Sequence, residues 1–186
     1  MRNKLFAAIC ALLALAMLPG GAFAKAKKAP KKEIGIQLYS VRSLIGSFGK
    51  NQQDYKPVLK QLADMGYTSV EAASYKDGLL YGQNPEQFRK DVEAAGMKVL
   101  STHCTLNLSD EELASGDFSK ALQWWDECIA AHKAAGAEYI VVPSMRRIDN
   151  LKDLKTYCDY FNEIGARCKA AGMKFGYHNH SREYQK

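Results

Sequence analysis

The sequence contains a short motif in which two histidines flank an asparagine, His178-Asn179-His180. In a β-strand the side chains of His178 and His180 point to the same face, about 7 Å apart along the strand. Two imidazoles in that arrangement suit a divalent metal ion or a polar substrate, and Glu183 can add an oxygen ligand. The alternative interpretation is that both histidines only bind substrate through hydrogen bonds or lie on an exposed loop.

Three further polar residues lie in otherwise apolar segments. Glu71 stands between Val70 and Ala72, where a buried carboxylate is costly without a partner, so we expect it to be functional or ion-paired. Gln37 and His103 each lie near the end of an apolar segment. A lone histidine in such a place is often a hydrogen-bonded structural residue, but here the other polar candidates are expected at the same edge.

These polar residues fall near the C-terminal ends of five predicted strands. Each strand is short and largely apolar, as in a parallel sheet that is covered on both faces. The predicted strands span residues 34–39, 68–73, 99–103, 139–143 and 174–179.

An amphipathic helix, a glycine and an apolar strand follow one another four times in the chain. Glycine supplies the left-handed conformation that ends a helix, and the intervals of 30, 40 and 36 residues are the length of one βα unit. The four glycines are Gly66, Gly96, Gly136 and Gly172.

Helix starts and buried helix faces are also indicated. Asn84-Pro85 predicts an N-cap with a first-turn proline, and Asn150 predicts another N-cap. Three- and four-residue spacing of apolar residues predicts the face that each helix buries. In the last helix this predicted face comprises Leu151, Leu154, Cys158, Phe161, Gly165 and Cys168.

Regular alternation of strands and helices predicts an α/β protein with a parallel sheet, either a doubly wound open sheet or a (β/α)8 barrel. Polar residues at the C-terminal strand ends favour the barrel, whose enzymes place their chemistry on that face. No glycine-rich phosphate loop follows the first strand, which argues against a dinucleotide-binding sheet. A complete barrel has eight strands in about 250 residues. We therefore predict a parallel TIM-barrel type over residues 33–186, truncated to about five of eight βα units.

The first 24 residues have the pattern of a secretory signal peptide. Arg2 and Lys4 precede 14 apolar residues, and residues 22–24 form a small-residue cleavage site. The apolar stretch spans about 21 Å as a helix, short of the roughly 30 Å hydrocarbon core. We therefore predict cleavage after Ala24, a Lys-rich linker over residues 25–32, and export to the periplasm or the medium. No transmembrane anchor is expected after cleavage.

The net charge of +6 arises in this N-terminal region. Residues 33–186 carry 19 basic and 20 acidic residues, and 47% of the chain is hydrophobic, which is ordinary for a globular domain. A balanced charge removes the compositional argument for nucleic-acid binding, so we expect no nucleic-acid partner.

Four cysteines follow the predicted cleavage site, namely Cys104, Cys128, Cys158 and Cys168. Four cysteines allow three disulfide pairings, and the sequence does not choose among them. Cys158 and Cys168 are ten residues apart on one predicted helix and too distant to pair with each other. Their placement at apolar helix positions favours buried thiols.

Several segments resemble the sugar phosphate isomerase/epimerase family, the xylose isomerase-like TIM barrels. The first predicted strand lies in GIQLYSVR (35–42), the second follows as GYTSVE (66–71), and the last is FGYHNH (175–180) followed by Glu183. The resemblance runs in order from Ile34 to Tyr184. The opening and closing segments together are its most specific part.

The resemblance implies an isomerase or epimerase that moves a proton next to the carbonyl of a sugar or polyol. It also implies a divalent cation (Mn, Zn, Mg or Co) that polarises the carbonyl. The family's further ligands, an Asp, a His and a Glu from later strands, have no counterpart in the 186 residues. The implied site residues are Glu183 and Glu71 as catalytic residues, His103, His178, His180 and Gln37 as substrate-binding residues, and Glu183 and His180 as metal ligands.

Other functions of the same fold stay open at this point. They are a non-catalytic remnant or carbohydrate-binding module, and a lyase acting on oxidised glycosides. An apurinic endonuclease shares the superfamily, but export and balanced charge oppose DNA as substrate. A homo-oligomer also stays open. From the 186 residues alone we expect weak Mn²⁺ or Zn²⁺ binding and no isomerisation, because a catalytic metal needs three or four rigid ligands.

Overall fold

The computed structural model describes residues 32–184. The chain divides into two units, Met1–Lys32 and Glu33–Lys186, and the description that follows concerns the second. The predicted signal peptide and all but the last residue of the predicted linker lie outside the described residues, so both stay predictions.

The described residues alternate between strands and helices, as predicted. No helix among residues 32–184 has both the length and the apolar character needed to cross a membrane. The elements in chain order are β1 (Gly35–Gln37), η1 (Leu38–Val41), α2 (Arg42–Ile45), α3 (Lys56–Asp64), β2 (Ser69–Ala72), β3 (Tyr75–Lys76), β4 (Leu79–Leu80), α4 (Pro85–Ala94), β5 (Lys98–His103), α5 (Asp110–Ser115), α6 (Ser119–Ala134), β6 (Tyr139–Val142), α7 (Leu151–Ala170), β7 (Lys174–Tyr177) and η2 (Ser181–Tyr184).

One five-stranded sheet has the order β1-β2-β5-β6-β7, and each neighbouring pair in it is parallel. This confirms the predicted α/β fold of TIM-barrel type, with five parallel strands of which the first four are each connected to the next through at least one helix. All five predicted strands are present; β5 ends at the predicted residue and the others end one or two residues earlier. A separate antiparallel hairpin, β3–β4, lies between β2 and α4 and was not predicted.

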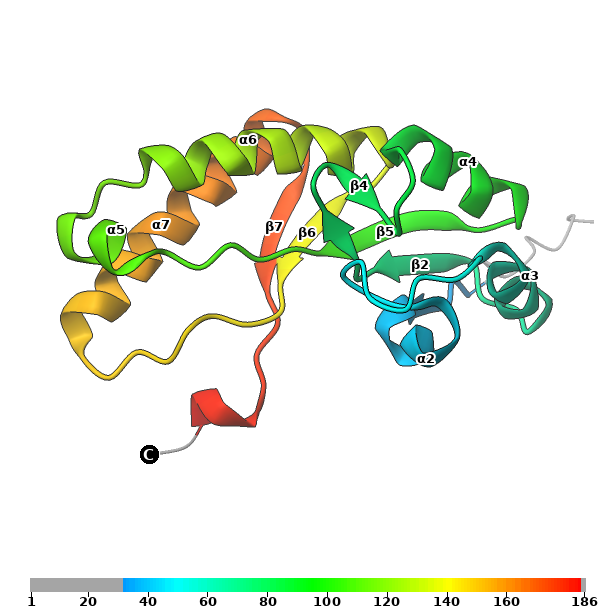
Figure 1. Ribbon diagram of the computed structural model, residues 1–186, viewed down its shortest axis with the longest axis horizontal. Helices are drawn as coiled ribbons and strands as arrows, with labels where there is room; N and C mark the ends of the chain where they lie inside the picture. The colour runs from blue at the N-terminus through cyan, green and yellow to red at the C-terminus, as the bar shows by residue number, and fades with distance from the viewer. Residues whose placement is uncertain (1–31, 185–186) are drawn as a thin grey trace, which may run out of the picture. The chain divides into compact units, whose positions relative to one another are not determined.

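Helices cover the sheet and enclose the core. Helix α4 contacts β5, and helix α7 contacts β7. Helix α6 contacts both α4 and α7, so the three helices follow one another along the sheet (Figure 1). Trp125 of α6 is fully buried, and its Nε1 donates a hydrogen bond to the Tyr160 hydroxyl of α7 at 2.6 Å. The two longest helices are thus joined by a buried polar contact as well as by apolar packing.

The predicted boundaries of the helices are confirmed. Asn84 and Asn150 cap α4 and α7, and each side-chain oxygen accepts a hydrogen bond from a backbone N–H at 2.9 Å. At the other ends, a positive φ requires a residue without a Cβ. The four predicted glycines have φ values of 98° at Gly66, 86° at Gly96, 82° at Gly136 and 78° at Gly172.

The predicted buried face of α7 is wrong in the first half of the helix. Leu151 is 84% exposed and Cys158 is also exposed, whereas Tyr157 and Tyr160 are buried; the predicted Cys168, near the end of the helix, is buried as expected. The helix is rotated toward its tyrosines because their hydroxyls find partners in the loop after β5. The hydroxyl of Tyr157 accepts from a backbone N–H at 3.2 Å, and that of Tyr160 donates to a backbone carbonyl at 3.0 Å.

Candidate functional site

The register of β1, β2 and β5 places three polar side chains in one row. Gln37 lies opposite Glu71, and Glu71 lies opposite Ser101. A bulge in the β2–β5 pairing skips Leu100, so that Ser101 rather than Leu100 faces the carboxylate. Directly opposite residues project on the same face of a sheet. The two predicted residues therefore meet, together with a serine that was not predicted.

The Glu71 carboxylate accepts hydrogen bonds from three side chains. Gln37 Nε2 donates to Oε1 at 2.7 Å, His103 Nε2 lies 2.9 Å from the same oxygen, and the Ser101 hydroxyl donates to Oε2. Burial raises the pKa of Glu71, but the hydrogen bonds from His103, Ser101 and Gln37 outweigh it and lower the pKa to about 2. Glu71 is therefore a stable, fully partnered carboxylate.

His103 connects this row to the histidine pair. Its side chain is only 7% exposed, and its Nε2 also lies 3.4 Å from His178 Nδ1, with the two rings 5.2 Å apart. We assign the Nε2 proton toward Glu71, because the carboxylate is the strongest acceptor within reach. Gln37, Ser101 and His103 are thus hydrogen-bonded to Glu71, and His178 contacts His103. We call these five residues the Glu71 cluster, which comprises Gln37, Glu71, Ser101, His103 and His178.

The histidine pair follows β7 and is not part of it. The strand was predicted to continue to residue 179, but it ends at Tyr177. Glu183 turns the chain back at this point, since it accepts hydrogen bonds from the Tyr177 hydroxyl at 2.6 Å and from the His180 N–H at 2.8 Å. The rings of His178 and His180 stack 4.6 Å apart, and His180 is exposed. The two histidine side chains therefore lie on the same side of the chain, as predicted, although the backbone that carries them is not part of a strand.

Residues of the Glu71 cluster line two cavities. Gln37, Glu71 and Ser101 border one of about 230 Å³. His103 borders the other, of about 300 Å³, together with the aromatic side chains of Tyr75 and Trp124. The second cavity thus combines a polar edge with an aromatic wall, which is the usual composition of a small-molecule site.

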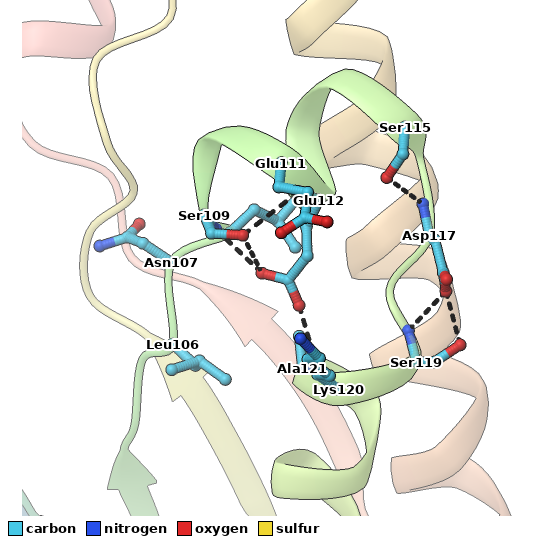
Figure 2. Close-up of a pocket in the computed structure, with 11 residues that line it drawn as sticks. Leu106, Asn107, Ser109, Glu111, Glu112, Ser115, Asp117, Ser119, Lys120 and Ala121 are labelled. Atoms are coloured by element: carbon cyan, nitrogen blue, oxygen red, sulfur yellow. Dashed lines mark hydrogen bonds between the residues drawn. The ribbon is translucent and has the colours of Figure 1, made fainter.

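A larger cavity of about 650 Å³ lies between α5 and the start of α6, and Figure 2 shows its lining. Glu112 accepts hydrogen bonds there from the backbone N–H groups of Ser109 at 2.9 Å and Ala121 at 3.2 Å. Asp117 accepts one from the Ser119 N–H at 3.0 Å. These carboxylates are occupied in capping helices, and no residue of the Glu71 cluster lines this cavity.

The residues implied as metal ligands supply suitable donor types. Glu183 offers carboxylate oxygens and His180 an exposed imidazole, which are common ligands of Mn²⁺ and Zn²⁺. Both oxygens of Glu183 also accept hydrogen bonds within its own turn. A catalytic site needs three or four protein ligands. This pair therefore provides part of a divalent metal site.

Comparison with protein families identifies the fold. Residues 59–186 match the family described as the xylose isomerase-like TIM barrel. The chain belongs to this family. The resemblance expected from its strand motifs is therefore confirmed.

Several solved structures have a similar fold. A sugar phosphate isomerase/epimerase from Parabacteroides distasonis ATCC 8503 is 30% identical, with a TM-score of 0.68 over 87% of this chain and 56% of that one. D-psicose 3-epimerase, determined in the presence of D-fructose, is 15% identical, with a TM-score of 0.56 over 80% of this chain and 55% of that one. IolI, determined with a zinc atom, is 14% identical, with a TM-score of 0.56 over 78% of this chain and 51% of that one.

The last two likenesses concern the fold alone. The chain spans a little over half the length of these three structures. A comparison with curated proteins gives no match.

The low pKa of Glu71 predicts how this xylose isomerase-like domain responds to acid. The folded pKa of about 2 lies below the ordinary value of 4.5, so ionised Glu71 stabilises the fold at neutral pH. That contribution, about 2–3 kcal/mol, is expected to disappear as the pH falls from 4.5 to 2. Urea unfolding of the wild type and of Glu71→Gln, measured between pH 7 and pH 3, should show their difference shrinking. Glu93→Gln, at an exposed carboxylate, is the control, and a Glu71→Gln difference that stays constant with pH would contradict the prediction.

Proposed function

We propose that the chain is the N-terminal part of an exported sugar or sugar-phosphate isomerase or epimerase that transfers a proton next to a carbonyl. The observation that carries the proposal is the Glu71 cluster, which gathers polar side chains from the C-terminal ends of β1, β2, β5 and β7. Barrel enzymes hold their substrates at that end. Residues 1–24, with their signal-peptide pattern, support export.

Within the Glu71 cluster, Glu71 orients other groups. A carboxylate with a pKa of about 2 is a weak base at neutral pH, so its role as an acceptor that fixes His103 and Gln37 is favoured over proton abstraction. His103 and His178 then present ring nitrogens to the hydroxyl groups of a sugar. Tyr75 and Trp124 supply the aromatic wall against which the C–H face of the sugar packs.

A divalent metal would be held in part by Glu183 and His180. When bound, such an ion polarises a carbonyl oxygen and makes the neighbouring C–H group more acidic. The zinc atom in the structure of IolI supports a metal in this fold. The hydrogen bonds from the Tyr177 hydroxyl and the His180 N–H hold the Glu183 carboxylate in place beside the stacked histidines.

Ketose binding tests the proposal directly. We expect calorimetric titration of the chain with D-fructose, D-psicose and their phosphates to show saturable binding of at least one sugar. The Glu112→Gln variant alters the larger cavity and should bind as the wild type does. If no ketose or ketose phosphate binds saturably, the proposed function is wrong.

A second function is carbohydrate binding without turnover. It is favoured because Glu71 is fully partnered, and because Glu183 and His180 are only two of the three or four ligands that a catalytic metal needs. The two functions differ in whether a proton leaves the carbon next to the carbonyl. They can be separated in a chimera in which residues 33–184 replace the matching part of the P. distasonis protein. In D₂O with Mn²⁺, deuterium incorporation into a bound ketose supports the isomerase or epimerase. Binding without incorporation, when the parent protein does incorporate deuterium, supports the binding module.

A further inference from the structure

Two cysteines from distant parts of the chain meet in the core. Cys104 directly follows β5 and Cys128 lies in the middle of α6, and their sulfur atoms are 2.9 Å apart. Non-bonded carbon atoms pack at about 3.5–4.0 Å, so this is a close approach even before the larger size of sulfur is considered. A disulfide bond has its sulfurs about 2.0 Å apart. A movement of about 0.9 Å along the line joining the sulfurs would therefore close the bond.

The surroundings of the pair favour a disulfide over a metal ion. His132 lies one turn after Cys128, and the three residues form a group with its ligand atoms within 4.8 Å of one another. The Nδ1–H of His132 already donates to the Cys128 carbonyl at 2.6 Å, so Nδ1 has no free lone pair. A metal ion could therefore use only the Nε2 atom of this ring, which has no hydrogen-bond partner among the described residues, and the spacing of the two sulfurs decides against it. Tetrahedral zinc with Zn–S bonds of about 2.3 Å would hold two sulfurs roughly 3.7 Å apart, which is farther than the observed contact.

We propose that Cys104 and Cys128 form a disulfide bond in the exported protein. A disulfide oxidant of low molecular weight, such as oxidised glutathione, supplies the chemistry. One cysteine thiolate attacks a sulfur of the oxidant, forms a mixed disulfide with it and releases the first reduced thiol. The other cysteine thiolate then attacks the protein sulfur of the mixed disulfide and releases the second reduced thiol. The protein loses two hydrogen atoms, and the oxidant gains them as two thiols.

The bond would close before the core is complete. Both cysteines are at most 4% exposed, and burial raises the pKa of the Cys128 thiol well above its usual range, with the contact to Cys104 adding to the effect. A protonated, buried thiol exchanges slowly. The proposed bond therefore forms during oxidative folding and is protected afterwards.

The bond would also hold a part of the candidate site. Cys104 is the residue after His103, and both line the cavity of about 300 Å³. Joining Cys104 to α6 fixes the end of β5, and with it the backbone that carries His103. The proposed bond is thus a support for the position of His103. It rests on the export in the proposed function and not on the isomerase or epimerase activity.

Refolding the reduced, unfolded protein that starts at Lys25, after the predicted cleavage site, in a glutathione buffer tests the proposal. The remaining thiols are alkylated under denaturing conditions, and peptides are mapped by mass spectrometry without reduction. We expect one peptide pair joined through Cys104 and Cys128, and alkyl groups on Cys158 and Cys168. The oxidised protein should also melt about 5–10 °C above the reduced one, because the bond closes a loop of about 25 residues.

Single variants give the controls. Cys158→Ser removes an exposed cysteine and should keep the joined peptide, whereas Cys104→Ala and Cys128→Ala should lose it and retain alkylated partners. The wild-type map decides the question even if the core variants fold poorly. Alkylation of both Cys104 and Cys128 in the folded wild type, a bond from either to Cys168, or stoichiometric zinc retained by unjoined thiols would overturn the proposal.

Discussion

Replacing Trp125 by alanine is expected to destabilise the domain by about 3–5 kcal/mol. The indole is fully buried, donates to the Tyr160 hydroxyl at 2.6 Å and packs edge-on against Phe175 of β7 at 6.1 Å between ring centroids. Its removal leaves a cavity where α6, α7 and β7 meet, and it deprives a buried hydroxyl of its donor. Urea unfolding followed by circular dichroism at pH 7 measures the loss.

The neighbouring tryptophan provides a matched control for this prediction. Trp124 is the same residue type on the same helix, but it is only partly buried and borders the 300 Å³ cavity. Trp124→Ala is expected to cost about 1 kcal/mol, as for a substitution outside the core. Equal losses for the two variants would show that the core is not centred on Trp125.

The sheet could be predicted because each of its strands is signalled locally. A helix that ends at glycine is followed within about two residues by a run of apolar residues, and this pattern depends on no distant part of the chain. Gly96 and Gly136, with φ of 86° and 82°, show the physical reason, since a residue with a side chain is strained there. Parallel order then follows from the alternation of strands and helices.

The β3–β4 hairpin and helix α5 were missed although each carries a signal. Asp77-Gly78 forms the two-residue turn of the β3–β4 hairpin with φ values of 50° and 79°, as Asp-Gly turns do. The flanking strands have only two residues each, too few to show alternation. Helix α5 begins with a capping box of Ser109 and Glu112, but its six residues bury a single side chain and form no apolar stripe.

The sequence predicted most residues of the candidate site but not the contacts between them. The sequence pattern indicated that Glu71 needs a partner, and the structure supplies three. Ser101 could not be found, because it faces Glu71 only through the bulge that skips Leu100. Strand register depends on how two segments about 30 residues apart pair with each other. A local sequence pattern does not predict that pairing.

Replacing His103 by alanine is expected to weaken ketose binding by about 10- to 100-fold. The variant removes the ring that joins Glu71 to His178, and it leaves the buried carboxylate with two of its three donors. Loss of a hydrogen bond to a charged group costs about 1.5–3 kcal/mol, and the edge of the 300 Å³ cavity loses its imidazole at the same time. Calorimetric titration with the ketose that binds the wild type measures the change.

Two further variants separate the role of the ring from the stability of β5. Thr102 is fully buried and adjacent to His103, but it points to the opposite face of the sheet, so Thr102→Val should bind within about twofold of the wild type. His103→Gln retains a donor that can reach Glu71, and its affinity should lie between those of the wild type and His103→Ala. If His103→Ala binds as tightly as Thr102→Val, then His103 serves only to partner Glu71. The sugar in that case does not contact His103.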